Sequence, residues 1–523
     1  MKNKRLYYAD KQNGEYQNPI LFADYSDPDV IRVGDTYYMV ASSFNYVPGL
    51  PILTSHDLVN WELVNYALPN IPYARYEVPQ HSQGVWAPAI RYRDDEFYIF
   101  VGMPDEGIFM LKTKDPLGQW SEPVCLLEGK GLIDPCPFWD EDGKAYVVHG
   151  FARSRIGFKS FLGIFPMTPD GTKAIGTDHL LYNGLETQPT IEGPKVHRRG
   201  EYLYIFAPAG GVETGWQTVL RAKDIHGPFE ERVVMRQGTS STNGPHQGAW
   251  IEDTSGKDWF VHFQSLGAYG RIVHLQPMRW TADGWPYIGM DSGDTEWGMP
   301  CDSYEKPYAA CHCEPTSLLA SDDFSSDKLA LQWQFMGNWR SDFFSLTERE
   351  QSIRLFARRL PEGCEPILWQ CPQAMTQKLV CPAFCASVVL DASGLNHGEQ
   401  AGFALMGGQY AYVAMRKNAE GFTLVHAGSH GDAHTESVLE SKNLRTAKLT
   451  LHMELQCVDG QPKVCFGYCV DGNAFVPLAK PFFPSRHTWV GAKPTLFVMS
   501  YDQCEGDVGH ADFSQYQVIA MKE

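Results

Sequence analysis

Apolar and polar residues alternate in short runs along the first 300 residues, in a phrase that recurs five times. Each copy starts with a polar or small residue, continues as an apolar run, turns at a short segment containing Asp or Gly, and ends in an aromatic run. Two runs rich in Val, Ile, Tyr, Phe and Trp about such a turn predict a β-hairpin. The five copies start at Asp27, Ala87, Asp134, Glu192 and His246.

A second turn phrase follows most of these hairpins, at 54–61, 113–120, 222–230 and, in a looser form, 281–285. A hairpin followed by a second hairpin makes a four-stranded unit, and units of about 50 residues are typical of radial β-propellers. The pattern therefore predicts a five-bladed β-propeller over residues 1–300. A sandwich or barrel also has many short strands but fits this long period less well.

The period is lost at residues 301–321, where polar residues and Pro indicate a linker. Residues 322–523 then hold alternating segments such as FCASVVLDAS, YAYVAMRK and KLTLHMELQ, without helical stretches. Such period-two segments predict an antiparallel, concanavalin-like β-sandwich. The predicted fold is therefore all-β, with a propeller followed by a sandwich.

Charge and composition disfavour some classes of binding partner. Lys and Arg number 44 against 62 Asp and Glu, which gives a net charge of −18. This balance disfavours nucleic acid and anionic membrane surfaces, because both reward clustered positive charge. No apolar run reaches the roughly 18 residues of a membrane span, and the basic N-terminus lacks the apolar core of a signal peptide. The 13 scattered cysteines favour reduced thiols over disulfides or zinc, so we expect a cytoplasmic protein.

Chemistry-bearing residues gather at equivalent positions of the repeats. In a propeller the innermost strand of each blade starts beside the axis, so these positions should converge on one central cavity. The residues there are Asp27, Trp86, Asp134, Glu192 and His246, which supply three carboxyl groups, an indole and an imidazole. Buried carboxylates cost several kcal/mol unless paired or ligated, so packing is a poor reason for this concentration.

Such a group suits acetal cleavage, in which one carboxylic acid protonates the leaving oxygen and one carboxylate activates water or attacks carbon. A third carboxylate would raise the pKa of the acid by like-charge repulsion. Taken singly, Asp27 and Asp134 could instead be turn residues before Pro, and His246 a packed core histidine. The set could also hold a metal, and a structural calcium ion near His246 stays an alternative.

Aromatic rings near the ends of the innermost strands offer faces for a sugar ring. Phe44, Trp86 and Trp216 are candidates, although each could simply pack between blades. Arg271 could bind a sugar hydroxyl or a carboxylate, or could be an ordinary surface charge.

Five ordered motifs resemble glycoside hydrolase family 43, in its β-xylosidase and α-L-arabinofuranosidase branch. They are SDPDVIRVGDTYYMV, GVWAPAIRY, IDPCPFWDEDGKAYVV, IEGPKVHRRGEYLYIF and GPHQGAWIE, and the DDFSSDKLALQWQF segment resembles the start of the branch's C-terminal sandwich. The resemblance implies an inverting hydrolase with Asp27 as general base, Glu192 as general acid and Asp134 as the residue that tunes the acid's pKa. It also implies that His246, beside a calcium ion or water, lies in the central cavity.

The same resemblance assigns Phe44, Trp86 and Arg271 to the pocket of the terminal sugar. Lys195, Val196 and Glu213 depart from the family's pattern, which puts the outer sugar subsites in question. Fructan and sucrose hydrolases share this architecture but carry NDPNG, RDP and EC motifs. The SDPD, IDP and EGP motifs here disfavour them.

The sequence therefore predicts an exo-acting inverting hydrolase that releases terminal β-D-xylose, α-L-arabinofuranose or both from small plant cell-wall oligosaccharides. No cofactor is required, and in an inverting site the base and acid should stand about 6.5 to 9.5 Å apart. Two alternatives are a non-catalytic carbohydrate-binding propeller and a hydrolase acting almost only on α-L-arabinofuranosides. A scaffold protein would leave the central acids unexplained. The preferred sugar stays open, and a homo-oligomer is compatible with the sequence.

Overall fold

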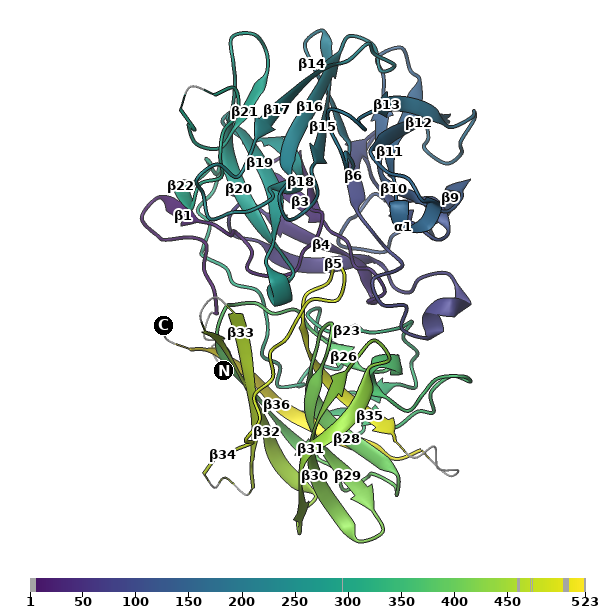
Figure 1. Cartoon of the computed structure of the whole chain (residues 1–523), viewed down its shortest axis with the longest axis vertical. Helices are drawn as coiled ribbons and strands as arrows, with labels where there is room; N and C mark the ends of the chain where they lie inside the picture. The colour runs from purple at the N-terminus through teal and green to yellow at the C-terminus, as the bar shows by residue number, and fades with distance from the viewer. Residues whose placement is uncertain are drawn as a thin grey trace.

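The computed structural model describes residues 6–293, 295–458, 461–470, 472, 474–501 and 508–521. Its two halves lie end to end, with the N-terminal half in purple to teal and the C-terminal half in green to yellow (Figure 1). The described segments that are helical are all short: α1 (Arg153–Ile156) and single 3-10 turns at Ala74–Glu77, Gly267–Tyr269 and Leu368–Gln370. The predicted all-β fold is confirmed.

Five four-stranded antiparallel sheets make up the N-terminal half, and each follows chain order from strand one to strand four. The sheets are β2 (Asp29–Val33), β3 (Thr36–Val40), β4 (Gly49–Ser55) and β5 (Glu62–Leu68); β6 (Pro88–Arg93), β7 (Glu96–Met103), β8 (Gly107–Thr113) and β9 (Val124–Glu128); β10 (Leu132–Trp139), β11 (Ala145–Phe151), β12 (Phe161–Met167) and β13 (His179–Asn183); β14 (Lys195–Arg199), β15 (Tyr202–Ala209), β16 (Trp216–Ala222) and β17 (Glu230–Met235); and β18 (His246–Glu252), β19 (Asp258–Ser265), β20 (Arg271–Trp280) and β21 (Pro286–Ile288). All five predicted hairpins are present as the first two strands of these sheets.

The five sheets are the blades of a closed propeller. First strands of successive blades contact one another from β2 through β6 and β10 to β14, and β18 of the fifth blade contacts β2 of the first. The second turn phrases of the sequence lie between the third and fourth strands of their blades, as at 54–61 between β4 and β5. The first strands therefore surround the axis.

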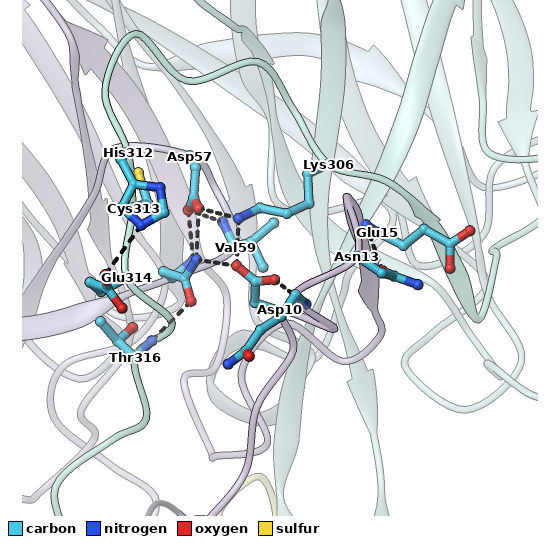
Figure 2. A network of polar contacts seen from close by, with 12 residues as sticks. Asp10, Asn13, Glu15, Asp57, Val59, Lys306, His312, Cys313, Glu314 and Thr316 are labelled. Carbon is cyan, nitrogen blue, oxygen red and sulfur yellow. Dashed lines mark hydrogen bonds and ion pairs between the residues drawn. The ribbon is translucent and has the colours of Figure 1, made fainter.

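The segment after the propeller is held against it by a buried ion cluster. Strand β22 (Ser303–Glu305) pairs with β1 (Glu15–Gln17) near the N-terminus. The Lys306 ammonium then bonds Asp10 at 2.5 Å and Asp57 at 2.9 Å (Figure 2). Asn60 donates to both carboxylates and accepts from the backbone N–H of Thr316. Residues 301–316 are thus anchored along the first blade.

Two seven-stranded antiparallel sheets form the C-terminal sandwich. In spatial order, one holds β23 (Gln334–Phe335), β26 (Met375–Thr376), β35 (Lys493–Ser500), β28 (Glu399–Met406), β29 (Ala411–Asn418), β30 (Gly421–His430) and β31 (Thr435–Leu444); the other holds β24 (Phe344–Ser345), β25 (Ile353–Phe356), β36 (His510–Ala520), β27 (Phe384–Asp391), β32 (Lys448–Val458), β33 (Gln461–Cys469) and β34 (Val476–Pro477). Along β27 and β32 exposure alternates, which places the predicted apolar positions inside.

One apolar cluster runs through both halves. It includes Val47 and Leu50 of the first blade together with Trp333, Phe335 and Phe384 of the sandwich, all buried. Val47 and Phe335 also pair through their backbones, with N···O distances of 3.1 and 2.6 Å. The domains therefore share a core, which fixes the sandwich against one side of the propeller. Among the described residues, no helix is long and apolar enough to cross a membrane.

Candidate active site

The four predicted ionisable residues stand at the starts of the first strands of four blades. Asp27 precedes β2 by two residues, Asp134 is the third residue of β10, Glu192 precedes β14 by three residues, and His246 opens β18. Both aspartates have a left-handed backbone with φ of 56°, a conformation in which Asp is enriched over most residues. Their side chains bond groups of other segments, so neither serves merely as the turn residue before its proline.

Asp27 is held by three donors. One carboxylate oxygen, Oδ2, accepts from the hydroxyls of Ser26 at 2.7 Å and Ser42 at 2.6 Å. The other, Oδ1, lies 2.8 Å from the guanidinium of Arg271, whose side chain is 9% exposed. Hydroxyls and a guanidinium all donate, so this surrounding suits an ionised carboxylate. Asp24 positions the arginine by accepting from its backbone N–H at 2.9 Å.

Asp134 and Glu192 form a second, differently surrounded pair. Asp134 Oδ2 accepts from the backbone N–H of Gly193 at 2.9 Å and from Gln247 Nε2 at 3.0 Å. Burial first, and then the negative charge of Asp27, raises the pKa of Asp134. Burial and then the charge of Asp134 raise the pKa of Glu192, although the glutamate side chain keeps 22% exposure. The pair therefore keeps a proton, held by Glu192 once Asp134 is ionised, at pH values where ordinary carboxyls lose theirs.

Backbone irregularities aim these side chains. The pairing of β10 with β11 is interrupted by a bulge at Asp134, and that of β18 with β19 by a bulge at Gln247. The two bulged residues are the ones that bond each other, in line with the use of bulges to redirect side chains at active sites. Gly193 has φ of 57°, and a Cβ there would meet Gln247 at 2.7 Å, so the close approach requires glycine.

His246 is fully buried, and its Nε2 lies 3.5 Å from Glu192 Oε1. Burial, and then the charge of Arg271, lowers the pKa of His246 to about 3. The imidazole is therefore neutral at ordinary pH, and the contact with Glu192 is not an ion pair. No hydrogen-bond partner within the described part of the chain reaches either ring nitrogen.

A calcium ion near His246, which the sequence leaves open as an alternative, would find few ligands among the described residues. Calcium takes six to eight oxygen ligands at about 2.3 to 2.6 Å. Across the described ranges, no three His, Cys, Asp or Glu side chains come together as a metal site. One imidazole and one carboxylate do not fit a calcium ion held by the protein's side chains, and calcium takes no part in the mechanism below.

The predicted aromatic positions differ in their surroundings. Phe44 is buried in a cluster that also holds sandwich residues, and Trp86 packs at the edge of that cluster. Trp86 stays partly exposed and donates from Nε1 to the carbonyl of Ser82 at 3.0 Å. Trp216 opens β16, where Nε1 donates to Gln188 and the guanidinium of Arg236 lies 4.6 Å from its ring. The contacts of Trp216 are thus within its own blade and its neighbours.

The sandwich supplies an aromatic residue that the sequence did not suggest. The Trp489 ring lies 6.0 Å from that of Trp86, nearly perpendicular to it, and 5.5 Å from the guanidinium of Arg271. Two residues later, the backbone N–H of Gly491 donates to Asp24 at 2.9 Å. This short segment before β35 therefore reaches the propeller beside the general-base candidate.

Ser42, Gln247 and Asp24 were also missed, for different reasons. Gln247 adjoins His246 and could have been found by reading the repeat position one residue further. Ser42 lies after β3 and meets Asp27 only because the hairpin brings both strand ends together. Asp24 acts through backbone N–H groups far along the chain, which no sequence motif reveals.

The residues that depart from the family pattern occupy two places. Lys195 is 1% exposed and donates to the carbonyl of Pro88 at 2.8 Å; its charge opposes the rise in the pKa of Asp134. Its charge thus acts on Asp134, one of the central carboxyls. Glu213 is half exposed and forms an ion pair with Arg486 of the sandwich.

Comparisons with known proteins agree with this geometry. Residues 16–286 match the model of glycosyl hydrolases family 43, and residues 321–518 match the β-xylosidase C-terminal concanavalin A-like domain. A β-xylosidase of Formosa agariphila is 30% identical over 97% of this chain and 90% of its own length. A non-reducing end α-L-arabinofuranosidase of Bacteroides ovatus, BoGH43B, is 32% identical over 65% of this chain.

The chain covers 64% of the length of that Bacteroides protein and of a Xylanibacter ruminicola relative. Among solved structures, the GH43 protein BlXynB of Bacillus licheniformis superposes with a TM-score of 0.81 at 25% identity, over 97% of this chain and all of that one. Both domains are thus matched in sequence and in fold. The chain belongs to glycosyl hydrolase family 43, and hence to the glycosidases.

Proposed function

We propose that this chain is an exo-acting inverting glycosidase that releases terminal β-D-xylose, α-L-arabinofuranose or both from small plant cell-wall oligosaccharides. The observation that supports this proposal is the contrast between the surroundings of the carboxyl groups within one site. Asp27 faces three donors, whereas burial, and then the charge of a neighbouring aspartate, raises the pKa of Asp134 and of Glu192. Acetal hydrolysis needs this combination of a carboxylate and a carboxylic acid.

In this mechanism Glu192 protonates the leaving oxygen while Asp27 takes a proton from the attacking water. The donors around Asp27 hold its carboxylate in one orientation, with Arg271 as the fixed cation. Asp134 keeps the acid protonated through its charge, and neutral His246 lies against Glu192 without removing its proton. The sugar ring would lie against Trp86 and Trp489, whose faces suit the apolar side of a pyranose or furanose.

Both sugars stay within the proposal because the relatives divide between them. The Formosa protein is named a β-xylosidase and the Bacteroides protein an α-L-arabinofuranosidase. A cytoplasmic location and a homo-oligomer also remain predictions, which cell fractionation and light scattering test.

The direct test compares p-nitrophenyl β-D-xylopyranoside with p-nitrophenyl α-L-arabinofuranoside on the full chain. We expect turnover of at least one, lost in Glu192→Ala and kept in Glu186→Gln, an exposed glutamate of the preceding loop that serves as matched control. If neither aryl glycoside reacts, natural xylo- and arabino-oligosaccharides are tested as substrates next. Binding of these sugars without turnover by the unmodified chain would favour the carbohydrate-binding alternative.

Stereochemistry tests the assignment of Asp27. Proton NMR of the first product should show the anomer opposite to that of the substrate, before mutarotation. Retention would mean that Asp27 attacks carbon directly, which needs carboxyl groups only about 5 to 5.5 Å apart.

A further inference from the structure

A cavity lies between the propeller and the sandwich, and none of the catalytic carboxyls lines it. Its volume is about 250 Å³. Residues of β5, of the connection between the domains and of the sandwich surround it. Figure 1 shows β5 on the side of the propeller that faces the sandwich. The lining residues that matter here are Tyr25, Tyr66, Leu318, Leu331, Lys378 and Val380.

Aromatic and aliphatic side chains make up more than half of the cavity wall, and Ser317, Gln332, Gln377 and one cation, Lys378, supply polar groups. The Lys378 ammonium lies 4.9 Å from the centre of the Tyr25 ring. Beside it Lys493, only 2% exposed, places its ammonium 4.6 Å from the Tyr46 ring. Burial, and then the charge of Lys493, lowers the pKa of Lys378 to about 7.

Negative charge near these lysines is scarce. Asp24 is the acidic group that acts on both. Its two oxygens already accept from the backbone N–H groups of Arg271 and Gly491. Within the described ranges, neither lysine forms an ion pair with a carboxylate. Glu62, the acidic residue among those that line the cavity, is exposed at the rim.

This arrangement favours an anion of a particular shape. A buried ammonium without a counter-ion is costly, and a carboxylate placed beside it removes that cost. A cavity of about 150 Å³ lined by apolar side chains accepts benzene, so 250 Å³ has room for one ring with a carboxylate. Of the polar side chains in the wall, Gln332 and Gln377 already donate to the backbone carbonyls of Ser321 and Ala320, which leaves fewer donors for the hydroxyls of a sugar acid. The tyrosine faces pack well against an aromatic ring.

We propose that this cavity binds an aromatic monocarboxylate, with the carboxylate on Lys378 and the ring between Tyr25, Tyr66 and the leucines. The site is independent of the proposed catalytic function, since none of these residues belongs to the catalytic group.

Isothermal titration calorimetry of the full chain with benzoate tests the proposal. One site per chain should saturate at pH 6, where Lys378 carries its proton. Binding should be at least tenfold weaker at pH 8.5, where most of the free ammonium is deprotonated. Lys378→Met should abolish it, and the matched control Lys223→Met, on an exposed lysine of the fourth blade, should leave it intact.

Other probes separate this site from its rivals. Benzoate should still bind to Glu192→Ala; loss there with survival in Lys378→Met would move the ligand to the catalytic site and overturn the proposal. Equal binding of benzyl alcohol would show a merely apolar cavity, and equal binding of glucuronate a sugar-acid site; either contradicts it.

Two further measurements keep the test decisive if Lys378→Met does not fold. Leu331→Trp, which fills the cavity from its partly exposed rim, should block benzoate. In the unmodified sequence, reductive ¹³C-methylation of lysines allows the pKa of Lys378 to be followed by NMR. Benzoate should raise that pKa by at least one unit, and no change would refute the proposal.

Discussion

Two pairs of carboxyl groups in the propeller have opposite acid–base behaviour. At the edge of the first blade, hydrogen bonds from Lys306 and Asn60 outweigh burial and lower the pKa values of Asp10 and Asp57. At the axis, burial and the neighbouring acid raise the pKa values of Asp134 and Glu192. Figure 2 shows the first pair closed around its lysine.

The difference lies in where the cation is placed. Lys306 contacts both acids of the edge pair, whereas the central cation, Arg271, contacts Asp27 and forms no ion pair with Asp134 or Glu192. A carboxyl with an ion-pair partner gives up its proton readily and contributes to stability. One without a partner keeps its proton, costs stability at neutral pH, and can therefore serve as a general acid.

Removing the central acid should have the largest effect. Glu192→Gln should lower kcat/KM more than 100-fold, because general-acid catalysis contributes about 10²- to 10⁴-fold. A glycoside with a better leaving group, such as 2,4-dinitrophenol, should lose much less. Equal losses on both substrates would argue against the role of Glu192 as the acid.

The same variant should gain stability. A carboxyl whose pKa is raised on folding contributes to stability at pH values below about 4, the ordinary carboxyl pKa. That contribution is lost as the pH rises through the raised pKa. Glu192→Gln should therefore unfold at a higher urea concentration than the unmodified chain at pH 8, with the gain shrinking toward pH 5.

Removing the lysine of the edge pair should lower the stability of the fold and leave catalytic activity unchanged. Lys306→Met leaves Asp10 and Asp57 buried without their cation, which should cost about 2 kcal/mol at pH 7. Carboxyl groups whose pKa values are lowered on folding stabilise the folded state above about pH 4. That contribution is lost as the pH falls through the lowered pKa values. The difference from the unmodified chain in urea unfolding should thus fade toward pH 3; a constant difference would contradict the ion-pair explanation.

Removing the neighbour of the acid should move the pH profile. Asp134→Asn deletes a negative charge that raises the pKa of Glu192, so the falling limb of kcat/KM should shift to lower pH and neutral activity should drop about tenfold. Full activity with an unchanged pH optimum would exclude Asp134 from the mechanism.

The smallest expected change concerns the donor to Asp134. Gln247→Leu removes a hydrogen bond that favours the ionised aspartate, so the pKa of Asp134 should rise further. Activity should fall about threefold, and Gln247→Glu should restore none of it. A profile identical to that of the unmodified chain would show that the bond only fixes the bulge.

The repeat predicted more of the molecule than any motif alone. Five Asp- or Gly-containing turns between aromatic runs determine five hairpins, and their common register located Asp27, Asp134 and Glu192 at strand starts. Strand β22 could not be foreseen, because its three residues pair with β1 almost 300 positions away. Trp489 could not be predicted for the same reason. Its position depends on how the sandwich packs against the propeller, and this packing depends on the shapes of the two surfaces rather than on the local sequence pattern.

The apolar core that the two domains share also affects how the chain folds during its synthesis. Val47 and Leu50 are synthesised early, but Trp333, Phe335 and Phe384, which cover them, come later. Once the fifth blade has been synthesised, the ribosome needs roughly 10 to 50 s to add the remaining two hundred or so residues, at about 5 to 20 residues per second. During that interval the first blade presents a bare apolar side. A gene truncated after the propeller would make this state permanent, and its product should aggregate.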